Sequence, residues 1–265
     1  MKLREGVSVV EFNVDLTGRT AVVTGASRRG AIGAAVCLAF AGAGADVAFT
    51  HWTSYDREKY GSDVNEPEVL CDELRALGVR ADGLEFDLGA ADAAVQLMDA
   101  VNERLGQVDI LVNNAAYSTQ DGYEELDAAT LDRHYAVNLR TTALLSVEFA
   151  RRYRGGSGGR IVNLSSGQAV GPMPGLLAYA ATKGAIEAFT SSLSVEVAAK
   201  GITVNAIDPG GTDTGWMSHE LKANIQHEMG FGRIGQPEDA ARLILFLASD
   251  AGAWITGQTI HSRGA

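Results

Sequence analysis

The sequence predicts an α/β fold: a doubly wound parallel sheet of about seven strands with helices on both faces. Short β-branched and apolar runs alternate along the chain with longer segments of helical periodicity. Such alternation is typical of parallel sheets, because each crossover needs a helix to return the chain to the same edge. A length of 265 residues suits a single domain over residues 1–265, with residues 1–15 as an amino-terminal extension.

The first strand and the turn after it have the pattern of a Rossmann-type dinucleotide site. Residues 20–24 (TAVVT) form a β-branched run, a glycine-rich turn follows, and an Ala-rich helical pattern comes next. Glycines let the backbone approach a pyrophosphate closely, and a helix amino terminus presents free N–H groups. The residues expected to bind the cofactor here are Gly25, Ser27, Arg28, Arg29, Gly30 and Ile32, with Gly33 as the third glycine of the turn.

The end of the second strand indicates which cofactor binds. Residues 46–50 are expected to form this strand, and no carboxylate follows directly; Asp56 lies several residues farther on. An acidic residue at that position would bind the ribose hydroxyls of NAD and repel a 2′-phosphate. Arg28 and Arg29 are either phosphate-binding residues or solvated surface charges. NADP(H) is therefore expected, with NAD(H) as the alternative.

Residues 51–67 are expected to form a long, polar, irregular connection. Its aromatic residues Trp52, Tyr55 and Tyr60 have three open roles: covering an adenosine, contacting another subunit, or ordinary loop packing. A helix (68–77), a strand reaching residues 86–88, a helix (90–105) and the strand VDILVNNAA then follow.

The chemistry is expected at Tyr179 and Lys183. Apolar residues at helical spacing follow Tyr179, and two residues four apart on a helix share one face. A nearby cation favours the ionised form of a phenol, so this pair could exchange a proton with a substrate oxygen. The same spacing occurs at Tyr55 and Lys59, within the stretch expected to be irregular. A buried strand (160–164) precedes the Tyr179 pair and ends at Ser165 and Ser166, where open α/β sheets place ligand groups.

These motifs together resemble the short-chain dehydrogenase/reductase family, and most of all its 3-oxoacyl-(acyl-carrier-protein) reductase branch, from residue 16 to residue 264. In that family a serine about thirteen residues before the tyrosine polarises the carbonyl. The count reaches Ser166 from Tyr179 but Gly42 from Tyr55, so the second pair fails. The resemblance implies that Tyr179 donates the proton and that Lys183 binds the nicotinamide ribose and lowers the tyrosine pKa. It also implies that Asn138 orders a relay water, the alternative being a satisfied internal polar group.

The resemblance also assigns cofactor contacts. It implies that Asp87 contacts the adenine, that Leu88, Asn114 and Ala115 neighbour the cofactor, and that Pro209, Gly210 and Thr212 face the nicotinamide. Residues 211–232 would form the substrate lid. Three features depart from the family: a glycine turn two residues longer, Ala116 in place of a glycine, and a final His261-Ser-Arg-Gly-Ala in place of Asp-Gly-Gly.

The activity implied is NADP(H)-dependent hydride transfer between nicotinamide and a small-molecule carbonyl or secondary alcohol, with a 3-oxoacyl thioester as one candidate substrate. An NAD-linked dehydrogenase of a small alcohol or sugar is the alternative, and a non-catalytic dinucleotide sensor is an alternative of another class. A homo-oligomer, either a tetramer or a dimer, is expected from the family.

Composition excludes several other functions. A net charge of −11 and a pI near 4.9 argue against nucleic-acid and anionic-membrane partners. The sequence has neither a signal-peptide pattern nor an apolar run of about 20 residues, so a cytoplasmic protein is expected. Cys37 and Cys71 are expected to be reduced thiols, and without a Cys or His cluster no metal site is expected.

Overall fold

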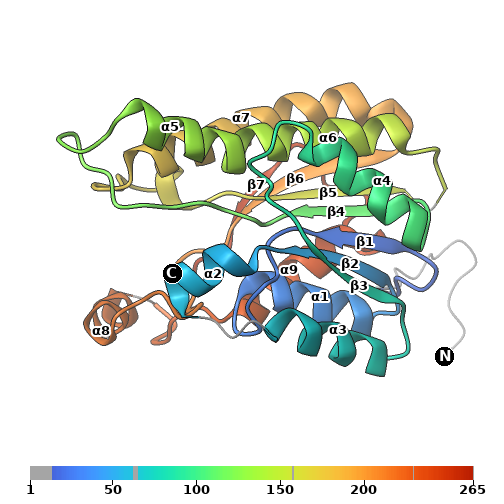
Figure 1. The fold of residues 1–265 in the computed structure, drawn as a ribbon, viewed down its shortest axis with the longest axis horizontal. Helices are drawn as coiled ribbons and strands as arrows, with labels where there is room; N and C mark the ends of the chain where they lie inside the picture. Colours follow the sequence, from blue (N-terminus) through green and yellow to red (C-terminus); the bar gives the residue numbers. More distant parts are fainter. Residues whose placement is uncertain (1–13, 62–64, 157, 229, 265) are drawn as a thin grey trace, which may run out of the picture.

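The computed structural model describes residues 14–61, 65–156, 158–228 and 230–264, and a seven-stranded sheet forms its centre (Figure 1). The strands are β1 (Thr20–Val23), β2 (Asp46–His51), β3 (Ala81–Glu85), β4 (Ile110–Asn113), β5 (Gly159–Leu164), β6 (Ile202–Asp208) and β7 (Thr259–His261). They lie in the order β3-β2-β1-β4-β5-β6-β7, and every neighbouring pair is parallel. The doubly wound parallel sheet is thus confirmed. The strand order reverses between β1 and β4, which is the crevice where such sheets bind ligands.

Helices cover both faces of the sheet (Figure 1). One face carries α1 (Ile32–Gly42), α3 (Glu66–Ala76) and α9 (Pro237–Ala248), and the other carries α4 (Ala93–Leu105), α6 (Thr141–Arg152) and α7 (Leu177–Val197). Each face has its own apolar core, one around Phe40 and Ile244 and one around Leu97 and Phe149. Strands β1, β4, β5 and β6 are buried along their whole length. Burial on both faces explains why these strands read as continuous apolar runs in the sequence.

Two further helices lie at the carboxyl edge of the sheet, α2 (Thr53–Tyr60) and α8 (His219–Glu228) (Figure 1). The expectation of an irregular connection over residues 51–67 is therefore wrong for its first half. Helix α2 has few apolar residues, but it ends on Gly61, which adopts the left-handed conformation at φ 64°. Arg57 and Lys59 in its last turn interact favourably with the helix dipole. Helix α8 lies within the expected lid segment.

A short helix, α5 (Ala128–His134), continues through a π-helical segment (Tyr135–Arg140) into α6. Single π-helical turns inside α-helices are frequent at functional sites. Most of the amino-terminal extension expected at residues 1–15 lies outside the described residues. In the part of the chain that the structure describes, no helix is long and apolar enough to cross a membrane.

Candidate active site

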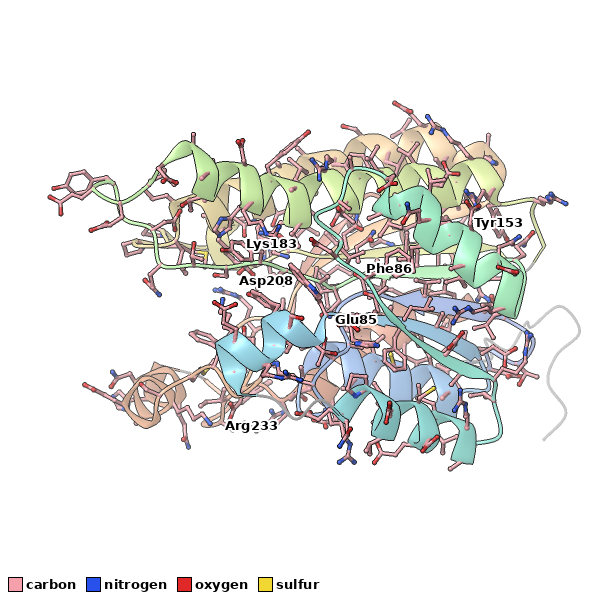
Figure 2. All side chains as sticks on the ribbon, viewed as in Figure 1. Glu85, Phe86, Tyr153, Lys183, Asp208 and Arg233 are labelled. Atoms are coloured by element: carbon pink, nitrogen blue, oxygen red, sulfur yellow. The ribbon has the colours of Figure 1, made fainter. Side chains whose placement is uncertain are left out.

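The helix α7 brings Tyr179 and Lys183 together at the carboxyl edge of the sheet. The Lys183 side chain is 2% exposed, and its Nζ lies 5.5 Å from the centroid of the Tyr179 ring. The same Nζ donates a hydrogen bond of 2.7 Å to the carbonyl oxygen of Leu164, the last residue of β5. This bond ties the helix to the strand end that carries the serines. In Figure 2, Lys183 and Asp208 lie in the same region, between the upper helices and α2.

Burial shifts the pKa values of both groups. It lowers the pKa of Lys183 from 10.5 to about 8, because an ammonium is disfavoured away from water. Burial also raises the pKa of Tyr179, and the hydrogen bond with the Ser166 hydroxyl only partly offsets that rise. The carboxylate of Asp208 raises it further. In the protein by itself, Tyr179 is therefore a protonated phenol at neutral pH.

The two serines after β5 have different partners. The Ser165 hydroxyl is buried and donates to Oε1 of Glu187 at 2.5 Å, while Nε2 of Gln168 donates to Ser165 Oγ at 3.1 Å. Ser166 is the serine that hydrogen-bonds Tyr179. The structure thus brings together the three residues expected to carry the chemistry, Ser166, Tyr179 and Lys183, and gives Ser165 a structural role.

Asn138 is fully buried in the π-helical segment, and its side chain is satisfied by other protein groups. Its Oδ1 accepts from the backbone N–H of Tyr117 at 2.7 Å, and its Nδ2 donates to the Tyr117 carbonyl at 2.9 Å. The Nδ2 also donates to Thr182 Oγ1 at 3.1 Å, on α7 between the tyrosine and the lysine. This geometry fits the alternative of a satisfied internal polar group, and the bonds fix the segment after β4 against α7.

The glycine turn follows β1 and packs tightly at two of its three glycines. Gly25 has φ 72°, and a Cβ there would lie 2.7 Å from the Cα of Ala115. A Cβ on Gly33 would lie 2.5 Å from the carbonyl oxygen of Gly25, so helix α1 approaches the turn as closely as a glycine allows. Gly30 is exposed and faces open space, so no steric need for a glycine exists there.

The amino terminus of α1 fits the phosphates of a dinucleotide. The helix begins at Ile32, and neither a side-chain cap nor an acidic residue occupies its first turn. The free N–H groups and the positive end of the helix dipole are therefore available to an anion. The turn itself is fixed by β2, because Thr50 accepts from the backbone N–H groups of Gly25 and Ala26.

Asn114 and Ala115 join the end of β4 to the same turn. The Asn114 Nδ2 donates to the carbonyl oxygens of Thr24 and Gly25, both at 2.9 Å. The Thr24 hydroxyl accepts from the backbone N–H groups of Asn114 and Ala115, both at 3.0 Å. Sequence reasoning missed Thr24, although its position as the last residue of the β-branched run was a usable signal. Asn114 thus shapes the cofactor turn through hydrogen bonds to its backbone.

The two arginines of the turn already have partners. Arg28 stacks on Tyr60, with its Cζ 3.8 Å from the ring centroid, and its Nε lies 3.5 Å from Asp56. Its Nη1 donates to the carbonyl oxygen of Thr214 at 2.6 Å, in the segment expected to be the lid. Arg29 is exposed and pairs with Glu73 on α3.

Asp56 lies much nearer the glycine turn than its sequence position suggested. Helix α2 brings its carboxylate to Arg28 and into a hydrogen bond with Ser27. Burial raises the pKa of this carboxyl group. The expectation that no carboxylate lies near this part of the site is therefore wrong. The sequence did not predict helix α2, and it is this helix that brings Asp56 back to the glycine turn.

Helix α2 also reaches across to the segment after β4. The Tyr55 and Lys59 pair, expected in an irregular stretch, lies on this helix, and Lys59 Nζ donates to the Tyr55 hydroxyl at 3.0 Å. Lys59 also donates to the carbonyl oxygen of Ser118, and the Tyr55 ring lies 5.8 Å from that of Tyr117. The hydroxyl of Tyr60 contributes to the raised pKa of Tyr179. The aromatic residues of α2 thus lie between the glycine turn and α7.

The remaining expected contacts lie along the same edge. Asp87 is exposed after β3 and accepts from the Gly89 N–H at 2.8 Å, whereas Leu88 is buried. Gly210 has φ 66°, which suits the turn that Pro209 begins. The Thr212 hydroxyl donates to the Pro209 carbonyl at 3.0 Å.

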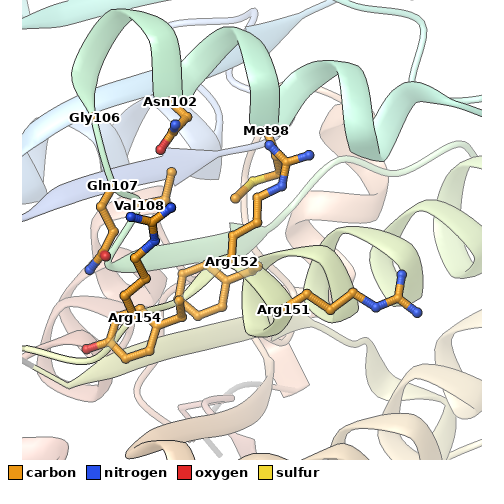
Figure 3. Close-up of a pocket in the computed structure, with 10 residues that line it drawn as sticks. Met98, Asn102, Gly106, Gln107, Val108, Arg151, Arg152 and Arg154 are labelled. Carbon is orange, nitrogen blue, oxygen red and sulfur yellow. The ribbon is translucent and has the colours of Figure 1, made fainter.

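A cavity of about 550 Å³ lies elsewhere, at the carboxyl ends of α4 and α6 (Figure 3). Arg151, Arg152 and Arg154 line it together with Met98 and Tyr153. In Figure 2 the label of Tyr153 lies at the opposite end of the sheet from Lys183. The cavity is therefore separate from the Tyr179 and Lys183 site. We identify the candidate active site by its side chains and not by the volume of a cavity. Within the described residues, no group of three or more His, Cys, Asp or Glu side chains could hold a metal ion.

Comparisons with known proteins agree with this geometry. Residues 25–264 match a family model described as Enoyl-(Acyl carrier protein) reductase. The chain is 50% identical over 248 residues to the uncharacterized oxidoreductase YjdA of Bacillus subtilis, covering 93% of this chain and 96% of that protein. It is 31% identical to the 3-oxoacyl-[acyl-carrier-protein] reductase FabG of Aquifex aeolicus, covering 96% and 99% of the two chains.

Solved structures are similar over almost the whole chain. A putative short-chain alcohol dehydrogenase from Sinorhizobium meliloti superposes with a TM-score of 0.85 at 32% identity, covering 95% of this chain and 97% of that one. A blue fluorescent protein from a metagenomic library, solved in complex with NADPH, superposes with a TM-score of 0.84 at 30% identity, covering 94% and 98%.

Proposed function

The chain belongs to the short-chain dehydrogenase/reductase family, and from that premise we propose that it is an NADP(H)-dependent reductase of a small carbonyl compound. The observation that carries the proposal is the convergence of Ser166, Tyr179 and Lys183 at the carboxyl edge of the sheet. A hydroxyl, a protonated phenol and a buried ammonium lie together there, beside a glycine turn with a free helix amino terminus. These groups can bind a carbonyl oxygen and protonate it.

When bound, a nicotinamide cofactor would supply the hydride that the carbonyl carbon accepts. The Ser166 hydroxyl donates a hydrogen bond to the carbonyl oxygen and orients it. Tyr179 then gives its phenolic proton to that oxygen as negative charge develops there. Lys183 holds the ribose side of the cofactor and stabilises the phenolate that remains.

The raised pKa of Tyr179 means that its phenol holds a proton near neutral pH, which is the form that carbonyl reduction consumes. Oxidation of an alcohol would start from the phenolate instead.

Support for NADP(H) comes from Arg28, which lies at the turn with its guanidinium half-buried, and from the relative solved with NADPH. NAD(H) remains the alternative, and a specific observation favours it. Asp56 lies beside Ser27 and Arg28, and Glu73 neutralises Arg29, so a 2′-phosphate would meet carboxylates as well as guanidiniums. Because Arg28 already has three partners, it would have to exchange at least one of them for a phosphate.

A 3-oxoacyl thioester is one substrate candidate, supported by the similarity to FabG. We propose a homo-oligomer of this single-domain chain, a dimer or a tetramer, in the cytoplasm. The assembly can be measured by sedimentation. A small ketone or aldehyde remains the other substrate class.

Parallel titrations with NADPH and NADH, read by energy transfer from tryptophan to nicotinamide, test the cofactor proposal. We expect tighter binding of NADPH, weakened about tenfold in Arg28→Ala because one charge-assisted contact is lost. Arg242→Ala, which removes an exposed arginine on α9, is the matched control. Tighter binding of NADH, or an Arg28→Ala variant with unchanged selectivity, would contradict the proposal, and Asp56→Asn should then weaken NADH binding.

Turnover of a ketone panel tests the enzymatic function itself. Tyr179→Phe should lose carbonyl reduction by more than a hundredfold and still bind the cofactor, because only the transferable proton is removed. A non-catalytic dinucleotide sensor would keep its function after this change. A wild-type protein that binds the cofactor but reduces no carbonyl compound would favour the sensor.

A further inference from the structure

The side chains of Asp208, His261 and Arg263 meet at the end of β6. The Asp208 carboxylate is 1% exposed, and its Oδ2 lies 3.0 Å from His261 Nδ1 and 2.9 Å from Arg263 Nε. Its Oδ1 accepts from the N–H of Gly210 at 2.9 Å. A buried carboxylate thus anchors the segment after β7 to the turn after β6.

Arg263 lies directly beside the catalytic serine. A Cβ on Gly167, the residue after Ser166, would lie 2.2 Å from Arg263 Nη2, so the guanidinium occupies the space that any larger side chain at position 167 would need. The Cα of Arg263 also lies 3.0 Å from where a Cβ on Gly210 would be. Arg263 therefore lies between the serine loop and the Pro209 turn.

The segment that carries Arg263 also contacts the expected lid. The carbonyl oxygen of Gly264 accepts from the N–H of Phe231 at 3.1 Å, and the Phe231 ring packs against the same glycine. The arginine consequently lies where the serine loop, the Pro209 turn and the expected lid segment come together, next to the serine that would bind a substrate carbonyl.

The donors of this guanidinium are only partly used. Its Nε lies 2.9 Å from Asp208 Oδ2, but this buried nitrogen makes an ion pair and no hydrogen bond there, and within the described residues its Nη groups have no hydrogen-bond partner either. The side chain is 33% exposed, so these donors can reach a ligand. An arginine fixed at one end by a buried carboxylate presents its remaining donors in a rigid, planar arrangement.

We propose that Arg263 binds a carboxylate group on the substrate, so that the preferred substrate is an oxo acid. This inference rests on the proposed carbonyl reduction and specifies its substrate class. A guanidinium fork matches the two oxygens of a carboxylate. The charge of Asp208 offsets that of Arg263, and this leaves little net positive charge for a dianion such as a phosphate. A singly charged carboxylate suits the site better.

The test compares 2-, 3- and 4-oxo acids with their methyl esters, using the cofactor that the titrations identify. In the wild-type protein, kcat/KM for at least one acid should exceed that for its ester by about tenfold or more. Arg263→Leu should reduce this acid-to-ester ratio to near one. Arg263→Lys, which keeps the charge opposite Asp208 without the fork, should give an intermediate ratio, and Arg242→Leu should leave the ratio unchanged.

A second measurement does not depend on turnover. Calorimetric titration of the enzyme–cofactor complex with butyrate, a carboxylate without a carbonyl group, should show saturable binding that Arg263→Leu weakens about tenfold or more. If esters are reduced but no acid is preferred, or if Arg263→Leu keeps the ratio, the inference is overturned while the proposed reductase activity stands. If no carbonyl compound is reduced, the proposed reductase function is wrong. If butyrate does not bind, the inference that Arg263 binds a carboxylate is wrong, whatever the activity.

Discussion

Replacing Lys183 by methionine should abolish the activity of the protein and change its stability in a pH-dependent way. The ammonium is buried on α7, and burial lowers its pKa from 10.5 to about 8. Methionine has a similar length and no charge, so Lys183→Met removes the buried cation without opening a large cavity. Activity should be lost, because the proposed reaction needs the cation beside the phenol.

The expected change in stability follows from the pKa shift. One pKa unit corresponds to about 1.4 kcal/mol, so keeping the ammonium charged inside the fold costs about 3 kcal/mol below pH 8. The folded pKa lies below the unfolded one, so this cost is full at pH values under about 8. It decreases as the pH rises, and it is absent above about 10.5, where the unfolded lysine is also neutral. As the pH rises from about 7 to 9.5, the free energy of unfolding of the wild type should increase by about 2 kcal/mol relative to that of Lys183→Met.

Urea unfolding of wild type and Lys183→Met at several pH values between 7 and 9.5 measures this difference. The variant also leaves the Leu164 carbonyl without its donor, which lowers its stability by about 1–3 kcal/mol at every pH and does not change the slope. Lys200→Met is the matched control, because Lys200 is exposed and also donates to a backbone carbonyl, that of Ala150. A difference between wild type and Lys183→Met that stays constant with pH would refute the argument from the buried cation.

Ser166→Ala should lower kcat by about 10²–10³-fold, because the carbonyl oxygen loses a donor in the transition state, whereas Ser165→Ala should keep most of the turnover, since that hydroxyl is bonded to a neighbouring carboxylate. Steady-state kinetics with a ketone that the wild-type protein reduces checks both predictions. Gly33→Ala should lower stability by about 1–3 kcal/mol because its methyl group would press on a backbone oxygen of the turn, while Gly30→Ala faces open space and should change stability by less than about 0.5 kcal/mol in urea unfolding. The pH profile of kcat/KM for reduction should fall above about pH 8, where Lys183 loses its proton; a profile that is flat to pH 9.5 would count against its role.

The sequence predicted the sheet, and pointed to the residues of the candidate site, because both leave strong local patterns. Strands buried on both faces require continuous apolar runs, and β5 and β6 were located to within one residue at each end. The tyrosine and lysine share a helix face at a fixed spacing, and the thirteen-residue count separated Ser166 from Ser165. The hydrogen-bond partners of the two serines agree with that choice.

Helix α2 was missed because its stability does not come from its own sequence pattern. Its residues are mostly polar, and its contacts join parts of the chain far apart in sequence, from Lys59 to Ser118 and from Tyr60 to Arg28. Propensity and periodicity are local properties, so neither could indicate those partners. The position of Asp56 was missed for the same reason.

Several residues predicted for the site also hold its loops in position. Asn114 bonds the backbone of the glycine turn, and Asn138 bonds the backbone of Tyr117. Arg28 joins the turn to α2 through Asp56 and to the lid segment through Thr214. A cofactor phosphate that recruits Arg28 would compete with both contacts, so binding and the positions of α2 and the lid would be coupled. The selectivity for NADP(H) over NAD(H) therefore depends on whether Arg28 binds a cofactor phosphate or keeps its present partners Asp56 and Thr214. The carboxylate of Asp56 thus affects this selectivity together with Arg28.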